Sequence, residues 1–186
     1  RAAESIASVL YGDVNPSGKL PMTFPRRTGQ VPIYYNCTRN ESRGVNSYYG
    51  LRGESLVPYH DCLGTPMYEY GYGLSYTTFE YSNIYCDRTE ISLDELKAGA
   101  EFKIYADVTN TGERDGKETS QCYIRDCIAS MIRPLRELKG FSKNMIKAGE
   151  KVRVCFTLGY NELAFYNSRA EFNPEAGAFS IYVGSS

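Results

Sequence analysis

From about residue 76 onward, apolar and polar residues alternate with a period of two in several short runs. In the run 102–109, aromatic and aliphatic residues occupy every second position, and charged or hydroxyl-bearing residues fill the positions between them. The runs 151–158 and 179–183 follow the same rule. Because successive side chains of a strand point to opposite faces of its sheet, this alternation indicates strands with one buried face and one solvated face.

Turn-forming residues separate these runs, as at Asn110-Thr111-Gly112 and at Asp115-Gly116. About six or seven short strands within about 110 residues are typical of an immunoglobulin-like β-sandwich. The sequence therefore predicts a mainly β protein, with this sandwich over residues 76–186. The candidate strands lie near 79–86, 102–109, 118–125, 135–142, 151–158 and 179–183.

Residues 1–25 follow a different pattern. Residues 2–11 carry apolar side chains at helical spacing, and Gly12 follows at a natural helix end. Residues 15–18 (Asn-Pro-Ser-Gly) form a turn by composition, and 19–25 form a short extended run whose prolines keep it from the centre of a sheet. We expect the last helix and last strand of an α/β domain whose other strands lie upstream of Arg1.

Residues 26–75 show no regular period. A connection of about 50 residues is far longer than usual, so we expect a functional, disordered or domain-wrapping loop. The chain has 17 tyrosines and no tryptophan, which favours rings packed on half-solvated sheets over a dedicated sugar-binding surface.

Charge and composition argue against some classes of function. The net charge is −1, without the basic stripe of a nucleic-acid-binding protein. No apolar run reaches the ~18 residues that a membrane-spanning helix needs. The chain starts at Arg1 without a recognisable leader, so we expect it to be part of something longer.

The six cysteines permit disulfides, but none forms a Cys-x-x-Cys pair, and the only histidine is His60. A Cys/His metal site therefore has little support. Strand parity places Cys122 on the face of Ile124, in the core, and Cys155 on the solvent face. This parity favours unpaired thiols, and hence a cytoplasmic compartment over secretion.

Catalytic templates are also poorly supported. His60 lies beside Asp61 in the irregular stretch, and sequence neighbours seldom form a catalytic relay. Residues 71–73 (Gly-Tyr-Gly) lead into a strand rather than a helix, which argues against a phosphate-binding loop. The 22 acidic residues make carboxylate pairs inevitable, and we expect most of them to be solvated on turns and wet strand faces.

Several segments, taken in order, form a recognisable set: 7–25, 70–79, 108–116, 133–141 and 183–186. Together they resemble glycoside hydrolase family 3. The first resembles the end of the family's α/β sandwich domain, the second its bridge into the last domain, and the others its fibronectin type III-like domain. The resemblance divides the chain into the end of the α/β domain at 1–33, a linker at 34–75 and the fibronectin type III-like domain at 76–186.

The resemblance implies a retaining exo-glycosidase without cofactor or metal, most often a β-glucosidase that hydrolyses terminal non-reducing β-D-glucosyl residues. In the family, an Asp on a barrel domain is the nucleophile and a Glu on the α/β sandwich domain is usually the acid/base. No nucleophile motif matches within residues 1–186, so no catalytic residue is carried over. The implied partners are the barrel and α/β sandwich domains of the same enzyme, and a β-glucoside or oligosaccharide substrate, with neither nucleic acid nor membrane.

Within the resemblance, scaffold roles are expected for the glycines Gly18, Gly71 and Gly73, which favour conformations that a Cβ would oppose. Aromatic rings of residues 70–79 and charges of residues 133–141 are expected to brace the sandwich against the catalytic body. Two departures stand out. Pro58 replaces the basic residue that relatives tend to have there, and the usual end of the sandwich runs past Ser186.

Three alternatives stay open: a sugar-binding module without activity, a structural spacer, and the same region of a β-xylosidase. The binding candidates are Tyr48 and Tyr49, whose rings could reach the rim of the sugar pocket. The other interpretation is that rings of this loop fill gaps between domains.

Overall fold

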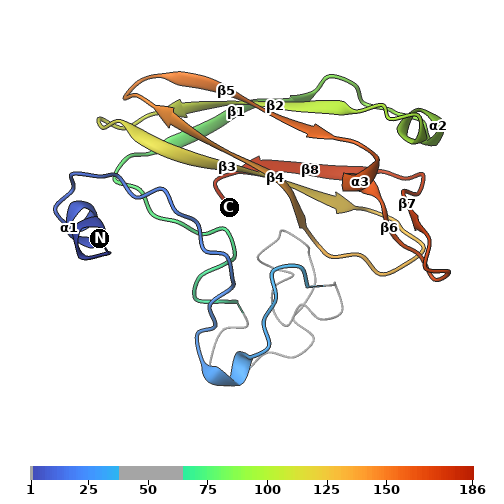
Figure 1. Ribbon diagram of the computed structural model, residues 1–186, viewed down its shortest axis with the longest axis horizontal. Coiled ribbons are helices and arrows are strands. Elements are labelled where there is room, and N and C mark those ends of the chain that lie inside the picture. Colours follow the sequence, from blue (N-terminus) through green and yellow to red (C-terminus); the bar gives the residue numbers. More distant parts are fainter. Residues whose placement is uncertain (1, 38–64) are drawn as a thin grey trace.

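The computed structural model describes residues 2–37 and 65–186, and its main body is a sandwich of two antiparallel sheets (Figure 1). The first sheet has the order β1 (Phe79–Cys86), β2 (Phe102–Asn110), β5 (Lys151–Leu158). The second has the order β4 (Glu137–Ile146), β3 (Gly116–Asp126), β8 (Phe179–Gly184). The predicted mainly β sandwich is thus confirmed.

One predicted strand begins later than expected. Strand β4 starts at Glu137, although the pattern suggested a start near residue 135. The N–H of Leu135 donates instead to the carbonyl of Cys37 at 3.0 Å, so its backbone is bonded to the N-terminal part of the chain.

Short elements complete the sandwich. The hairpin of β6 (Phe165–Tyr166) and β7 (Phe172–Asn173) follows α3 (Tyr160–Leu163), and α2 (Leu93–Lys97) lies between β1 and β2. Helix α2 begins with a capping box, in which the Ser92 hydroxyl accepts from the Glu95 N–H at 3.2 Å and the Glu95 carboxylate accepts from the Ser92 N–H at 2.8 Å.

The core consists of the inward-facing residues of both sheets, including Ile104, Val108 and Leu158, which are fully buried. At the β4/β5 edge the sheets meet closely, because a Cβ on Gly140 would lie 3.2 Å from the ring of Phe156. The parity prediction for the thiols is confirmed, since Cys122 is buried in this core and Cys155 is exposed, both as free thiols.

The N-terminal part lies outside the sandwich. Helix α1 (Ala2–Leu10) confirms the predicted helix, and Gly12, two residues after its end, has a φ of +81°. The extended run 19–25 forms an isolated bridge, Phe24 to Tyr68, rather than a regular strand. Its backbone also bonds at Leu20 to Tyr72 (2.8 Å), which places residues 67–72 of the expected irregular loop alongside it. None of the helices that the structure describes is long and apolar enough to cross a membrane.

Candidate interdomain docking site

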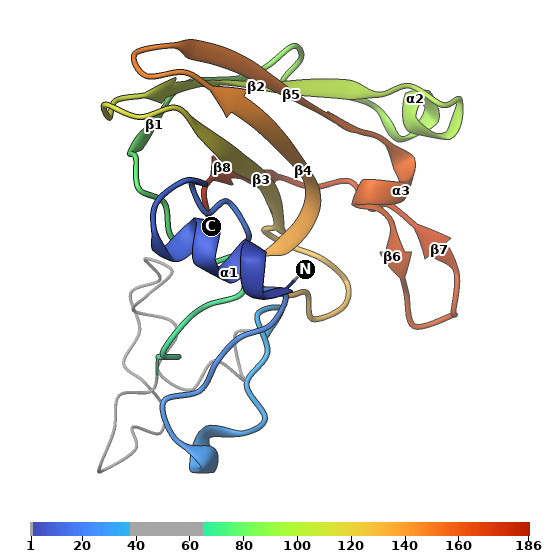
Figure 2. The ribbon, with the colours of Figure 1, turned by 60° about the vertical axis from the view of Figure 1, so that its left-hand side comes forward.

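Helix α1 and the segments 15–25 and 65–77 lie on the side of the β4-β3-β8 sheet that faces away from the other sheet (Figures 1 and 2). Strand β3 is therefore covered on both faces, and seven consecutive residues of it, from Glu118 to Ile124, are buried. We call the contacts of residues 9–20 and 71–77 with this strand and its neighbours the docking site.

Polar side chains of β3 form the centre of the docking site. The Gln121 amide donates to the carbonyls of Gly71 (3.0 Å) and Ser185 (2.6 Å), and its own carbonyl accepts from the Tyr123 hydroxyl at 2.7 Å. The Thr119 hydroxyl donates to the carbonyl of Ser17 at 3.0 Å. Because buried polar groups are costly unless they are bonded, these contacts fix where each segment meets the sheet.

Two glycines allow the segments to approach this closely. Gly71 has a φ of +80°, and a Cβ there would lie 2.5 Å from the Gln121 side-chain oxygen. A Cβ on Gly73 would lie 2.5 Å from the carbonyl oxygen of Gly18. The expected conformation is therefore confirmed for Gly71, whereas Gly73 needs to lack a Cβ because of the close approach of Gly18 and not because of a positive φ. Gly18, in contrast, does not have a positive φ, and a Cβ there would meet nothing within 4 Å.

Asn15 connects the turn 15–18 to residues 75–76, which lead into the sandwich. Its side-chain oxygen accepts from the Tyr76 N–H at 2.7 Å, and its amide nitrogen donates to the Ser75 hydroxyl at 3.0 Å. The Tyr76 hydroxyl donates to the carbonyl of Val9 at 2.7 Å. Helix α1 is thus attached to the sandwich through Tyr76, in the segment 70–79 that leads into it.

Asn110 continues this network into the sandwich. It is fully buried, accepts from the Thr77 hydroxyl at 2.6 Å and donates to the carbonyl of Ile146 at 3.0 Å. From the sequence, Asn110 is a turn residue within the segment 108–116 that resembles the family, with no indication of a buried contact. The signal for its role is weak, because its partners lie 33 and 36 positions away.

A buried ion pair crosses the docking site. The Lys19 ammonium lies 3.6 Å from the Glu118 carboxylate, and the two side chains are 14% and 5% exposed. The Tyr81 hydroxyl donates to the same carboxylate at 2.8 Å and lies 3.0 Å from the Ser120 hydroxyl. Burial raises the pKa of Tyr81, so it stays a neutral donor to Glu118. Glu118 is therefore an exception to the expectation that most carboxylates are solvated.

Asp107 is a second buried carboxylate, on the outer face of β2. It accepts from Arg153 at 2.7 Å and from the Asn83 amide at 2.9 Å. Asn83 has a φ of +49° at a bulge of β1, which turns its side chain towards Asp107. These hydrogen bonds, that of Arg153 first, lower the pKa of Asp107 to about 2.

The segment 133–141 was expected to brace the sandwich against the catalytic body, and it contacts the N-terminal part of the chain at Leu135, whose N–H donates to the carbonyl of Cys37 at 3.0 Å. The Arg136 guanidinium lies 4.3 Å from the ring centre of Tyr182, which belongs to β8 of the sandwich itself. Arg133 contacts residues of the sandwich instead. Its guanidinium lies 2.8 Å from the Glu137 carboxylate and stacks over the ring of Phe165. Phe141 is 70% exposed.

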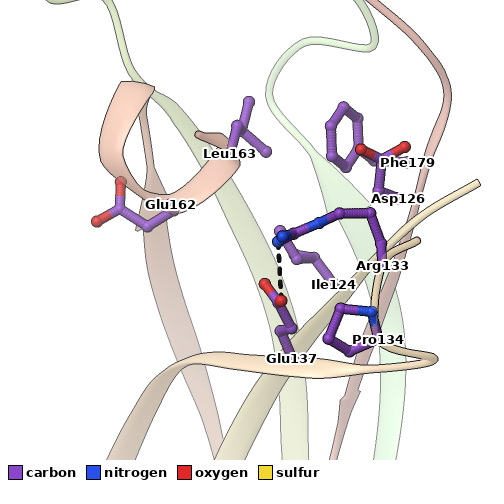
Figure 3. A pocket seen from close by; sticks show the side chains of 8 residues that line it. All are labelled: Ile124, Asp126, Arg133, Pro134, Glu137, Glu162, Leu163 and Phe179. Atoms are coloured by element: carbon purple, nitrogen blue, oxygen red, sulfur yellow. Dashed lines mark hydrogen bonds and ion pairs between the residues drawn. The ribbon is translucent and has the colours of Figure 1, made fainter. Parts of the chain in front are cut away.

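Figure 3 shows a small pocket beside the Arg133–Glu137 pair, where Asp126 and Glu162 also lie. Its volume of about 10 Å³ has room for little more than one water. Glu137 is bonded to Arg133 and to Lys139, which lies 2.9 Å away. These carboxylates therefore cannot flank a sugar ring.

The binding candidates Tyr48 and Tyr49, and also His60, lie outside the described residues. Within residues 2–37 and 65–186, no three His, Cys, Asp or Glu side chains are grouped so that they could hold a metal ion.

Two family models match the chain. The glycosyl hydrolase family 3 C-terminal domain matches residues 1–76, and the fibronectin type III-like domain matches residues 118–186. The two matches do not cover residues 77–117, where the first two predicted strands lie.

Curated and solved relatives agree with these matches. The chain is 40% identical to a periplasmic β-glucosidase of Salmonella typhimurium over 97% of its own length and 22% of that protein's. It is 41% identical to a β-xylosidase of Formosa agariphila over 100% of its length and 24% of that protein's. The crystal structure of a β-glucosidase from Listeria innocua with isofagomine superposes with a TM-score of 0.84 at 37% identity, covering 100% of this chain and 25% of that one. The chain thus spans about a quarter of these relatives.

Proposed function

Because this chain belongs to glycoside hydrolase family 3, we propose that it is a structural, domain-docking part of a retaining exo-acting β-glucosidase. The parent enzyme hydrolyses terminal non-reducing β-D-glucosyl residues. Its remaining partners are a barrel domain and the rest of an α/β sandwich domain, and it needs no cofactor.

The observation that carries this proposal is the buried polar face of β3. A free-standing sandwich would expose Thr119 and Gln121 to water. Here both side chains bond to backbone carbonyls of the N-terminal segments, at Ser17 and Gly71. A surface built in this way holds a neighbouring domain in one register.

The proposed division of labour places both catalytic carboxylates outside residues 1–186. Retaining hydrolysis needs two carboxyl groups about 5 Å apart across the scissile bond. The pocket beside Glu137 is too small for a sugar, and the buried carboxylates Asp107 and Glu118 each form an ion pair with a cation. This supports a scaffold role for the described residues.

We place the domain boundaries at 1–33, 34–75 and 76–186. In the linker, Tyr48 and Tyr49 are proposed to contribute to the rim of the sugar pocket. A tyrosine face can stack on a sugar ring, and loops held by a rigid scaffold are where specificity is usually tuned.

The sugar that the parent enzyme releases is glucose or xylose, because the relatives include a β-xylosidase that is 41% identical. Kinetics of the parent enzyme on matched aryl β-glucoside and aryl β-xyloside substrates decide between the two. The proposal expects a higher kcat/KM for the glucoside. A preference for the xyloside would assign this region to a β-xylosidase, and turnover of neither would favour a non-catalytic binding or spacer module.

A further inference from the structure

Residues 38–64 are flanked by two described stretches, 26–37 before them and 65–72 after them. Figure 1 shows the first stretch in light blue, at the end of the N-terminal part farthest from the sandwich. Only two of its side chains are buried, those of Gln30 and Cys37. A buried polar side chain is costly unless it is hydrogen-bonded, so the partners of Gln30 show what holds this stretch in place.

The Gln30 side chain joins the two stretches. Its carbonyl oxygen accepts from the backbone N–H groups of Arg26 at 2.5 Å and Arg27 at 3.2 Å, at the start of the short 3-10 helix η1 (Thr28–Gln30). Its amide nitrogen donates to the backbone carbonyl of Thr65 at 3.3 Å. The Arg26 Nε donates to the same carbonyl at 3.0 Å. We call the two bonds to the Thr65 carbonyl the clasp.

Further contacts join the two stretches on either side of the clasp. The rings of Tyr35 and Tyr70 are stacked, with their centres 4.0 Å apart and their planes 17° from parallel. The backbones of Phe24 and Tyr68 exchange two hydrogen bonds, of 2.8 and 3.3 Å. The residues on both sides of 38–64 are therefore attached to each other.

We propose that Gln30 is a positioning residue for the selection of substrate length by the parent enzyme. Its clasp holds together the two ends of the segment that carries Tyr48 and Tyr49. This inference rests on the proposed function, which assigns these two rings to the pocket rim. A connection with fixed ends has fewer conformations open to it, and a displacement of about 1 Å at a binding site is enough to weaken it strongly.

The variant Gln30→Glu of the parent enzyme removes the clasp donor and keeps the other contacts. A carboxylate still accepts from Arg26 and Arg27, but it has no proton to donate to Thr65. We compare kcat/KM for a longer oligosaccharide with kcat/KM for an aryl glucoside. The ratio of the two is expected to fall by about three- to tenfold, through a higher KM for the oligosaccharide, while kcat for the aryl glucoside stays unchanged. Equal losses on both substrates, or none, would overturn the proposal.

Asn144→Asp is the matched control, because it makes the same amide-to-carboxyl change within the sandwich. The Asn144 amide donates to the Ser142 hydroxyl at 2.9 Å, far from the clasp in the sequence, and the variant should leave the ratio unchanged. A fall as large as that of Gln30→Glu would mean that any such change alters the ratio, and it would also overturn the proposal.

A combined variant separates the clasp from the assignment of the rings. If Gln30 acts through Tyr48 and Tyr49, adding Gln30→Glu to the double alanine variant lowers the ratio no further. Where each change alone lowers the ratio, a combined fall equal to their product would overturn the proposal. A fall after Gln30→Glu but not after the double alanine variant would keep Gln30 as a positioning residue and remove the two rings from the rim.

Hydrogen exchange tests the clasp without any substrate. The N–H groups of Phe24 and Tyr68 are expected to exchange about tenfold faster in the Gln30→Glu enzyme than in the unaltered parent enzyme. The amides of residues 104–108 in β2 should not change, which shows that the sandwich stays folded. Unchanged exchange at Phe24 and Tyr68 would overturn the proposal whatever the kinetics show. Because this readout needs no turnover, a failure of the proposed glucosidase activity is seen separately, and an enzyme that prefers xylosides is measured on xylo-oligosaccharides and aryl xylosides instead.

Discussion

The side-chain amide of Gln121 reaches the backbone carbonyl of Gly71 at 3.0 Å, although the two residues are 50 positions apart. The bond joins the central strand of one sheet to the bridge that enters the sandwich. It exists only because Gly71 has a left-handed backbone and no Cβ at a place where one would meet Gln121. The docking site therefore depends on this pair.

Replacing Gly71 by alanine is expected to weaken docking in the parent enzyme. The left-handed φ costs about 1–2 kcal/mol for a residue with a Cβ. Displacing Gln121 from its carbonyl is expected to add about 1–3 kcal/mol. Gly149→Ala is the matched control, because Gly149 has a φ of +74° and nothing within 4 Å of its Cβ position. Thermal unfolding should show a larger loss for Gly71→Ala, and equal losses would mean that the contact is unimportant.

The ion pair of Lys19 and Glu118 gives a second prediction. Lys19→Met leaves a buried carboxylate without its cation and is expected to destabilise the enzyme by about 3 kcal/mol. The double variant Lys19→Met/Glu118→Gln should recover part of this loss, because a neutral amide still accepts from Tyr81. Arg88→Met is the control, since its pair with Glu95 is about half exposed and such pairs contribute about 1 kcal/mol or less. A Lys19 variant as stable as the Arg88 variant would contradict the prediction.

The lowered pKa of Asp107 predicts that the stability of the folded enzyme depends on pH. Its pKa is lowered to about 2 by Arg153 and then Asn83, below the value of about 3.9 for an unfolded Asp. The stability that it contributes is therefore complete above about pH 4 and is lost as the pH falls towards 2. The difference in unfolding temperature between the parent enzyme and its Asp107→Asn variant should shrink over that range. Arg153→Met should behave similarly, and a difference that stays constant from pH 7 to pH 2 would exclude Asp107 as its source.

The sequence could predict the β-sandwich because alternation in runs such as 102–109 depends only on neighbouring residues. The same parity placed Cys122 and Cys155 correctly. The sequence could not reveal that the second face of β3 is covered. Thr119 and Gln121 are polar residues of the kind that face solvent, and their partners Ser17 and Gly71 are far away in the sequence. Asp107 and Glu118 are exceptions to the expectation that most carboxylates are solvated. The sequence could not single them out, because their cations lie 46 and 99 positions away, at Arg153 and Lys19.

Tyr48 and Tyr49 are proposed to affect how well the parent enzyme acts on longer substrates. If their rings form the pocket rim, replacing both by alanine in the parent enzyme should lower kcat/KM for longer oligosaccharides by about three- to tenfold more than for aryl glucosides. Tyr166→Ala is a suitable control, because this exposed ring lies on the β6–β7 hairpin of the sandwich. Equal losses on both substrates, or none, would leave these rings without a role at the rim.

We propose that residues 1–186 dock domains and do not supply the catalytic carboxylates of the parent enzyme. Retaining glycosidases pass through a covalent glycosyl-enzyme intermediate, which a slow-reacting 2-fluoro glucoside traps for peptide mapping. We expect the parent enzyme to become labelled once, on a carboxylate outside residues 1–186. A label on any Asp or Glu within these residues would contradict it.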